Sequence, residues 1–160
     1  MLQALQSGVA QGVVSSPDAF VFEEVASAVL YRLKEYPRRR TRWGLIHADT
    51  HTGNWILHAG QMRLIDFSLC GWGYYLFDLG CCLPPLQPQQ RQALLAGYQA
   101  LRPLSQSDLL LIDMFALLAR LGAYAFHIHD PAQHEWIHRR IPQVVQDECR
   151  PFLEGATIYL

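Results

Sequence analysis

Two aspartates and an asparagine near the middle of the chain are the residues best suited to do chemistry. Asp49, Asn54 and Asp66 lie within the stretch LIHADTHTGNWILHAGQMRLIDFS, beside short apolar segments that have the pattern of β-strands. One carboxylate and one amide oxygen suit a hard cation that takes oxygen ligands and keeps its waters, which favours Mg²⁺. A second carboxylate nearby can accept a proton from a nucleophile. These side chains can act together only if the fold brings them to one place.

A β-hairpin is expected to bring them together. The sequence predicts a first strand over WILH, a turn over AGQ and a second strand over MRLI. In an antiparallel hairpin, the start of the first strand lies beside the end of the second. Asn54 immediately precedes the first strand and Asp66 immediately follows the second. Both are therefore expected at the same end of the hairpin, with Asp49 in the loop just before it.

The spacing of these residues resembles that of a known group of kinases. An aspartate, four residues, an asparagine and then a later D-F-G aspartate form the catalytic-loop pattern of protein-kinase-like enzymes. Here HADTHTGN contains Asp49 and Asn54, LIDFS contains Asp66, and GWGYYLFDLG contains Asp78. The three motifs resemble the aminoglycoside phosphotransferase and choline kinase family, most closely its homoserine-kinase-type and stress-response-kinase branch.

The resemblance implies a role for each matched residue. Asp49 matches the catalytic base that orients and deprotonates the acceptor hydroxyl, and Asn54 and Asp66 match the ligands of the Mg²⁺ that holds the nucleotide phosphates. His47 and Asp78 match residues that support the catalytic loop. The implied activity is phosphoryl transfer from ATP to the hydroxyl of a small molecule, such as an aminoglycoside, homoserine or a choline-like acceptor.

The chain departs from the family pattern at several points. Ala48 replaces a frequent glycine, and Ser68 and Leu69 stand where that branch often has acidic residues, which leaves Asp66 as the only clear carboxylate there. Kinases of this kind also have an N-terminal lobe with a phosphate-covering loop and a strand lysine. The single lysine, Lys34, is expected near the end of a helix. Residues 1–160 are therefore expected to be the C-terminal catalytic lobe alone, inactive when isolated, and to associate with an N-terminal lobe or with itself.

The rest of the sequence predicts helices around the hairpin. Ser16 as N-cap and Pro17 at the first position begin a helix that Pro37 ends. A short strand over WGLI precedes the catalytic loop, and CGWGYY is interpreted as a glycine-rich loop. Further helices are expected near residues 77–83, 87–101, 106–128 and 131–149. The predicted class is α+β and mainly helical, the C-terminal lobe of a protein-kinase-like fold with one small central β-hairpin.

Composition and charge exclude several other classes of function. The 160 residues, 51% of them hydrophobic, suggest one domain, and a formal net charge of −1 does not favour nucleic acid. The most apolar segment, residues 109–126, is interrupted by Asp113 and Arg120, which favours a buried helix over a membrane span. There is no secretory leader pattern, and none of the four cysteines forms C-x-x-C. Free thiols and a cytoplasmic location are expected.

Two alternatives remain open. One is a kinase-derived binding module without catalysis. The other is a zinc hydrolase, because HEWIH matches H-E-x-x-H, and on a helix His134 and His138 would share a face and bind zinc with Glu135 as the base. A zinc site of that type needs a third ligand that the sequence does not show. Trp136 and Ile137 indicate an ordinary amphipathic helix instead.

Overall fold

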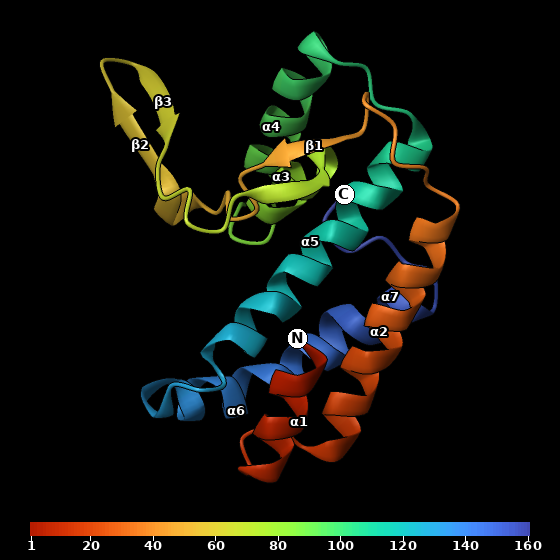
Figure 1. Cartoon of the computed structure of the whole chain (residues 1–160), viewed down its shortest axis with the longest axis vertical. Coiled ribbons are helices and arrows are strands. Elements are labelled where there is room, and N and C mark those ends of the chain that lie inside the picture. The colour runs from red at the N-terminus through yellow and green to blue at the C-terminus, as the bar shows by residue number, and fades with distance from the viewer. The chain divides into compact units, whose positions relative to one another are not determined.

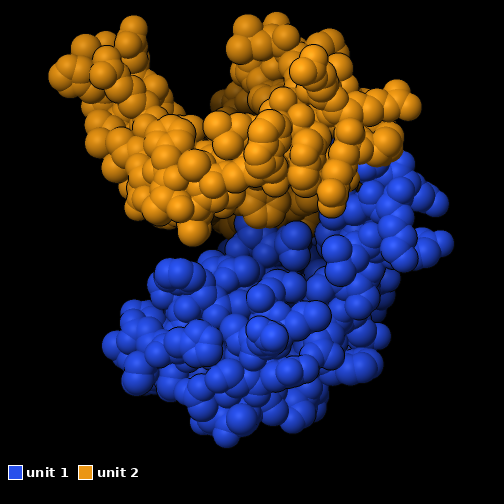
Figure 2. Space-filling view, viewed as in Figure 1, with its two compact units in different colours: residues 1–36, 117–158 blue, residues 37–116, 159–160 orange.

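The computed structural model describes all of residues 1–160, and the chain divides into two compact units (Figure 2). Unit 1 comprises residues 1–36 and 117–158, and unit 2 comprises residues 37–116 and 159–160. Helices make up most of the chain, and the strands form two separate two-stranded antiparallel sheets in unit 2 (Figure 1). The predicted mainly helical α+β class is therefore confirmed.

Unit 1 is built from helices alone. Its elements are α1 (Leu2–Ala10), α2 (Ser16–Lys34), the second half of α5 (Gln106–His127), the 3-10 turn η2 (Pro131–Gln133), α6 (His134–Val144), the π-helical turn η3 (Val145–Cys149) and α7 (Arg150–Leu153). The single helix predicted over residues 131–149 is thus divided into three helical types. Pro142, which has no N–H to donate, lies inside α6 shortly before the π turn.

The start of α2 lies one residue earlier than the sequence predicted. The N-cap is Ser15, whose side chain accepts a hydrogen bond of 3.1 Å from the N–H of Asp18, and Pro17 is in the first turn. Ser16 was the predicted cap, but Ser15 is the last residue with an extended backbone, so its hydroxyl can reach back to the free N–H groups. The helix ends at Lys34, before Pro37, as expected.

Unit 2 contains all the residues predicted to do chemistry. Its elements are β1 (Trp43–Ile46), the 3-10 turn η1 (Thr52–Asn54), β2 (Trp55–His58), β3 (Gln61–Leu64), β4 (Gly71–Tyr74), α3 (Tyr75–Cys82), α4 (Pro88–Leu101) and the first half of α5. Strands β2 and β3 form the predicted hairpin, but β3 begins and ends one residue earlier than predicted, at Gln61 and Leu64. Trp55 therefore lies opposite Leu64 and His58 opposite Gln61. Ala59 and Gly60 both have positive φ, as a two-residue hairpin turn of this hand requires.

The glycine-rich segment after the hairpin is a strand rather than the predicted loop. Strand β4 pairs with β1 in antiparallel register, with Gly44 opposite Gly73 and Leu45 opposite Trp72. Glycine is a weak strand former, but both glycines here leave room for neighbouring side chains. A Cβ at Gly44 would overlap the ring of Tyr75, and one at Gly73 would overlap Ile46. The close approach explains why this strand does not have the usual sequence pattern.

Helix α3 packs directly against α5, and this contact fixes where Asp78 stands. A Cβ at Gly80 would lie 2.8 Å from the backbone N of Ala116, so the two helices meet with no side chain between them at this point. Phe115 adds ring contacts to the start of α3, with centroids 5.7 Å from Tyr74 and 5.6 Å from Phe77. The first turn of α3, which carries Asp78, is therefore held firmly within unit 2.

Helix α5 is long and apolar enough to cross a membrane by length and composition, a test that buried core helices also pass. More than half of its most apolar window is buried. Both charged residues that interrupt it have partners. Asp113 accepts a hydrogen bond from the N–H of Tyr159 at 2.6 Å, and Arg120 Nε lies 3.1 Å from the Glu148 carboxylate. These contacts are those of a core helix.

Candidate active site

The loop between β1 and η1 is tied to the first turn of α3 through one carboxylate. Asp78 Oδ2 accepts the N–H of His47 at 2.8 Å, and its Oδ1 accepts the N–H of Ala48 at 2.7 Å. Bonds from N–H groups to an ionised carboxylate are stronger than those to a neutral acceptor. They hold Ala48 in a left-handed backbone conformation with φ of 66°, which a residue with a Cβ adopts only at some cost.

A second set of contacts ends at Thr50, which the sequence reasoning missed. Its hydroxyl donates to the backbone carbonyl of Asp78, and its own carbonyl accepts the indole N–H of Trp55 at 2.9 Å. The thiol of Cys82 also lies 3.2 Å from that carbonyl. Thr50 is buried. The only indication in the sequence was that Thr50 lies between two polar residues of the motif. An exposed threonine could have the same position, so the sequence did not show that this hydroxyl is buried.

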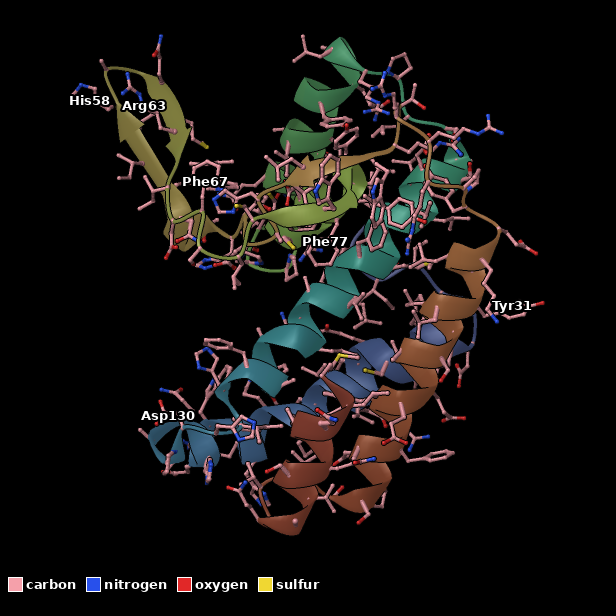
Figure 3. The ribbon with its side chains drawn as sticks, in the orientation of Figure 1. Tyr31, His58, Arg63, Phe67, Phe77 and Asp130 are labelled. Carbon is pink, nitrogen blue, oxygen red and sulfur yellow. The ribbon has the colours of Figure 1, made fainter.

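His47 connects the same loop to the end of the hairpin. Its Nε2 lies 2.9 Å from the carbonyl oxygen of Ile65, and its Nδ1 accepts the N–H of Asp49 at 3.3 Å. The buried ring also packs on Phe67, with centroids 4.5 Å apart. Phe67 lies at the base of the hairpin and His58 at its tip (Figure 3). His47 therefore fixes the distance between the loop and the residues that follow β3.

Asp49 and Asn54 contact each other directly. The Asn54 Nδ2 group donates to Asp49 Oδ2 and to the Asp49 backbone carbonyl, both at 2.9 Å. Asn54 is buried, whereas the Asp49 side chain keeps 33% of its surface exposed. Because both donor bonds use the amide nitrogen, the Asn54 Oδ1 atom is directed away from Asp49 and has no hydrogen-bond partner in the chain. One carboxylate is thus oriented yet accessible, and one amide oxygen is left for a ligand.

Asp66 stands at the same end of the hairpin as Asn54. The N–H of Ile65 donates to the Asn54 carbonyl at 3.0 Å, which extends the β2–β3 pairing to the residue just before Asp66. The Asp66 carboxyl is exposed, and Ser68 holds its pKa below the usual value of 3.8 through hydrogen bonds, with smaller contributions from His47 and His51. Asp66 has a positive φ of 60°. Its carboxylate forms no salt bridge within the chain, and its hydrogen bonds come from Ser68.

The donor set at this end of the hairpin suits a hard divalent cation. Asn54 Oδ1 and the Asp66 carboxylate are both oxygen ligands without a competing ion pair, and Asp66 faces solvent, so that water can complete the coordination. No group of three or more His, Cys, Asp and Glu side chains gathers anywhere in the chain. A site held by two protein ligands plus waters and phosphates matches Mg²⁺ better than a closed protein cage.

The residues of the H-E-x-x-H motif make other contacts. His134 Nε2 lies 2.8 Å from the carbonyl oxygen of Ile128, and Glu135 forms an ion pair of 3.3 Å with Arg139 one turn later. No third ligand lies near His138. The motif is part of the amphipathic helix α6, as Trp136 and Ile137 indicated.

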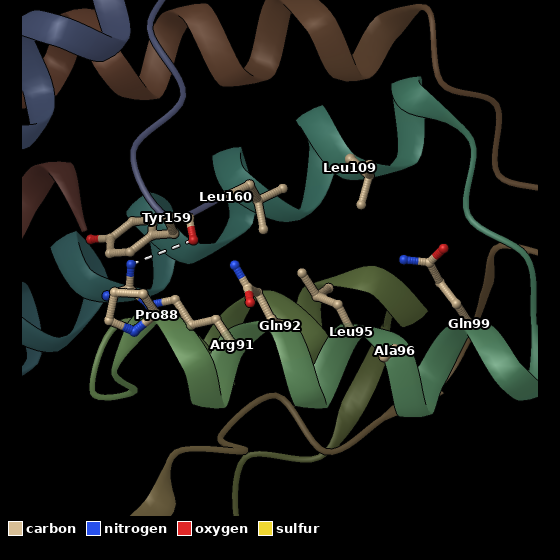
Figure 4. Close-up of a pocket in the computed structure, with 9 residues that line it drawn as sticks. All are labelled: Pro88, Arg91, Gln92, Leu95, Ala96, Gln99, Leu109, Tyr159 and Leu160. Atoms are coloured by element: carbon tan, nitrogen blue, oxygen red, sulfur yellow. Dashed lines mark hydrogen bonds between the residues drawn. The ribbon is translucent and has the colours of Figure 1, made fainter.

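A separate groove in unit 2 has a volume of about 400 Å³ (Figure 4). It lies between α4, the start of α5 and the segment at Tyr159, and Leu95 and Leu109 line it. Arg91 donates from Nε to the Leu83 carbonyl at 3.1 Å and from Nη1 to the Tyr159 carbonyl at 3.4 Å, so its guanidinium group is held in place within the unit. None of the five residues predicted to do chemistry or to support the loop lines this groove.

Apolar side chains are exposed around the two sheets. Leu45 and Trp72, which face each other across β1 and β4, are 67% and 74% exposed. No residue of β3 is buried. We call this set the sheet surface, and it includes both faces of the hairpin, since Ile56 and Leu57 are neighbours in β2. Its members are Leu45, Ile56, Leu57, Met62, Leu64, Ile65, Phe67, Leu69 and Trp72. Isolated two-stranded hairpins are marginally stable in water, so a hairpin with exposed apolar residues is expected to be covered.

Comparison with known proteins agrees with the motifs. Residues 4–109 match the model of the phosphotransferase enzyme family, which is more than half of the chain. Homoserine kinase of Polaromonas naphthalenivorans (strain CJ2) is 32% identical over 93 residues, covering 52% of this chain and 28% of that protein. Amicoumacin kinase of Bacillus subtilis (strain 168) is 30% identical over 63 residues, covering 39% of this chain and 18% of that protein.

Two solved structures share the fold. A microcompartment-associated aminopropanol kinase has a TM-score of 0.76 at 22% identity and covers 91% of this chain, which spans 48% of that kinase. The amicoumacin kinase hAmiN, in complex with AMP-PNP, Ca²⁺ and Ami, has a TM-score of 0.65 at 21% identity and covers 84% of this chain, which spans 46% of it. The chain thus spans less than a third of these two curated relatives and about half of the two solved ones. It belongs to the phosphotransferase enzyme family.

Proposed function

We propose that this chain is the catalytic lobe of an ATP-dependent O-phosphotransferase that acts on the hydroxyl of a small molecule. The observation that carries the proposal is the state of Asp49. Its Oδ2 is held by Asn54, its loop is tied to Asp78, and yet a third of its side chain is open to a substrate. A fixed, ionisable and accessible carboxylate is what a general base for a hydroxyl requires.

In the proposed reaction, Asp49 accepts the proton of the acceptor hydroxyl. The hydroxyl oxygen forms a bond to the γ-phosphorus of ATP, and the bond from that phosphorus to the bridging oxygen breaks, so that ADP leaves with the electron pair. Asn54 keeps the carboxylate plane fixed during the proton transfer, because its amide group holds one of the two oxygens. His47 and Asp78 act through the loop, by preventing Asp49 from moving relative to the end of the hairpin.

Asn54 Oδ1 and Asp66 are the groups proposed to hold Mg²⁺. When bound, the cation would neutralise charge on the nucleotide phosphates. Ser68 donates hydrogen bonds to the Asp66 carboxylate, which lower the pKa of that group and hold the carboxylate beside the end of the hairpin. The complex of a similar kinase with AMP-PNP and Ca²⁺ supports the use of a nucleotide and a divalent cation.

The lobe that would bind the rest of the nucleotide is proposed to lie on another polypeptide segment. Phosphoryl transfer in this kind of enzyme uses a lysine on a strand, and Lys34 is the only lysine and ends helix α2. We infer that the sheet surface meets an N-terminal lobe, or a second copy when that lobe is missing. The isolated chain is expected to have no measurable kinase activity and to bind Mg-ATP in the millimolar range or worse.

The acceptor is proposed to be a small molecule of the kind that the relatives are named for. These names are homoserine, aminopropanol and amicoumacin. Aminoglycoside and choline-like acceptors remain in the proposed class because the motifs resemble that family. A cytoplasmic location, where ATP and such metabolites occur together, is part of the same proposal.

A chimaera tests the proposal. The part of the aminopropanol kinase that this chain does not cover would be fused to residues 1–160, and ATP-dependent phosphorylation of a panel of amino alcohols and aminoglycosides would be measured. Transfer by the chimaera that is lost in Asp49→Asn, and kept in the matched control Asp130→Asn, supports the proposal. Asp130 caps the turn η2 in unit 1 and has no link to the loop.

Four outcomes contradict the proposal or a part of it. Turnover that is unchanged by Asp49→Asn would show that Asp49 is not the general base. A chimaera that binds ATP but transfers nothing to any acceptor would favour a binding module without catalysis. Micromolar ATP binding by residues 1–160 alone would show that the nucleotide site is complete without a second lobe. A clean monomer in light scattering at high concentration would count against a covered sheet surface.

A further inference from the structure

His51 occupies a defined position beside the predicted base. It is the N-cap of η1, with an extended backbone, and its Nδ1 accepts the N–H of Gly53 at 3.0 Å. Its Nε2 lies 3.6 Å from Asp49 Oδ1. The ring therefore spans the gap between the start of the 3-10 turn and the carboxylate. Neither the family match nor the names of the relatives gives this side chain a task.

The cap determines which nitrogen of His51 carries the proton. A ring nitrogen that accepts a hydrogen bond has no proton, so the neutral imidazole must carry its proton on Nε2. That N–H is the one near Asp49. The 3.6 Å separation is longer than a hydrogen bond, but catalytic contacts in structures without substrate often tighten only when the substrate binds.

Gly53 allows His51 to lie there. A Cβ at position 53 would be 2.7 Å from His51 Cε1 and 3.0 Å from Nδ1, distances at which the ring must move. Gly53 does not have a positive φ, so its backbone conformation does not require glycine. The imidazole therefore occupies the space that the Cβ of an alanine at position 53 would take.

We propose that His51 is a positioning residue for Asp49, and that Gly53 is required because it leaves room for the His51 ring. The inference rests on the proposed function of Asp49 as the base. When substrate binding shortens the 3.6 Å separation, Asp49 has one donor for each oxygen, Asn54 Nδ2 at Oδ2 and His51 Nε2 at Oδ1, which fixes the plane of the carboxylate. The His51 side chain is half exposed, so its contact with Asp49 stabilises an orientation rather than the fold.

Kinetics of the chimaera separate positioning from capping. His51→Ala should lower kcat about tenfold and leave the KM for ATP within about twofold, since a misplaced base slows transfer without changing nucleotide binding. His51→Asn keeps an acceptor for the Gly53 N–H but is too short to reach Asp49, so it should lose as much kcat as His51→Ala. His51→Gln, which is long enough to donate to Asp49, should recover part of the rate.

Gly53→Ala is a second way to move the His51 ring away from Asp49. It should lower kcat by a similar factor because it displaces the ring, and the double variant with His51→Ala should be no slower than either single variant. A His51→Asn variant with the full rate would overturn the inference and leave His51 as a cap only. Additive losses in the double variant would also overturn it, because Gly53 would then act independently of His51.

An NMR measurement on residues 1–160 needs no activity. Long-range ¹H–¹⁵N spectra should show His51 protonated on Nε2 and unprotonated on Nδ1, and Gly53→Ala should abolish this preference. The opposite tautomer in the wild-type chain would contradict the inference. The proposed function and the positioning role of His51 can fail separately. If Asp49→Asn keeps activity in the chimaera, the assignment of Asp49 as the base is wrong. If Asp49→Asn is inactive and every His51 variant is fully active, only the positioning role of His51 is wrong.

Discussion

Removal of the Asp78 carboxylate is expected to loosen the catalytic loop without unfolding the chain. The carboxylate accepts two backbone N–H groups, at 2.8 and 2.7 Å, and one of them belongs to the buried residue His47. Hydrogen bonds to charged groups contribute roughly 1.5–3 kcal/mol each. Asp78 is half-buried, so water recovers part of this loss. We expect the free energy that holds the loop closed to fall by about 3 kcal/mol in Asp78→Ala. In Asp78→Asn, which keeps one acceptor oxygen, it should fall by about 2 kcal/mol.

The loss is expected to be local because other contacts of the loop do not use this carboxylate. The Thr50 hydroxyl and the Cys82 thiol contact the Asp78 backbone carbonyl, which both variants retain. Native-state hydrogen exchange at the His47 and Ala48 amides measures the effect directly. A change of about 3 kcal/mol corresponds to roughly a hundredfold loss of protection.

A matched substitution controls for the change in charge. Asp130→Asn makes the same chemical replacement at an exposed cap that accepts a single N–H, from Ala132 at 3.0 Å. Asparagine caps nearly as well as aspartate, so protection near the hairpin should not change. If the amides of His47 and Ala48 exchange as slowly in Asp78→Asn as in the unchanged chain, the view that Asp78 holds the loop is refuted.

Three further predictions concern single residues. Ala48→Gly should raise the free energy of unfolding by about 0.5 kcal/mol in urea titrations, because relief of a left-handed alanine exceeds the added entropy of the unfolded glycine; a loss of stability would contradict it. Ser68→Ala should raise the pKa of Asp66 towards 3.8, seen by NMR titration of its carboxyl carbon. Because the pKa of Asp66 is lower in the folded chain, its ionisation stabilises the fold above pH 3.8, and this stabilisation is lost as the pH falls through the pKa of the folded state. Ser68→Ala should make this pH-dependent stabilisation smaller. Only Cys70 should react quickly with a thiol reagent at pH 8, because it is exposed while burial raises the pKa of the other three thiols, that of Cys149 to about 12; two fast thiols in a mass spectrum would refute this.

Local patterns in the sequence were sufficient to predict the hairpin. Ala59 and Gly60 separate two short runs with strand character, and the turn needs no contact with the rest of the chain. The turn has two residues rather than the predicted three, so the register differs by one residue from the one that the sequence predicted. Asn54 still meets the end of the second strand, at Ile65, as expected. The direct contact between Asp49 and Asn54 lies within the loop and the turn η1 that precede the hairpin. Whether the Asn54 and Asp66 side chains converge on one cation stays a prediction.

Contacts between distant segments could not be predicted in the same way. The pairing of β1 with β4 depends on Gly44 and Gly73, which local rules assign to loops, and the reason for each glycine is a side chain from elsewhere in unit 2. Thr50 and His51 are similar cases. The neighbours that give each a task, Asp78 for one and Asp49 for the other, become visible only when the loop is closed.

The contacts that orient Asp49 all come from one short part of the chain. His47, Asn54, Asp78 and His51 lie within unit 2, and none of their bonds to the loop involves unit 1. The proposed base is therefore already held by Asn54 and by its own loop without any nucleotide or second lobe, and only the His51 contact, at 3.6 Å, is longer than a hydrogen bond. Preorganisation of this kind means that a partner lobe needs to supply only the nucleotide in the correct position. A division of this kind predicts that lobes from different relatives can activate the chain, provided that they cover the sheet surface.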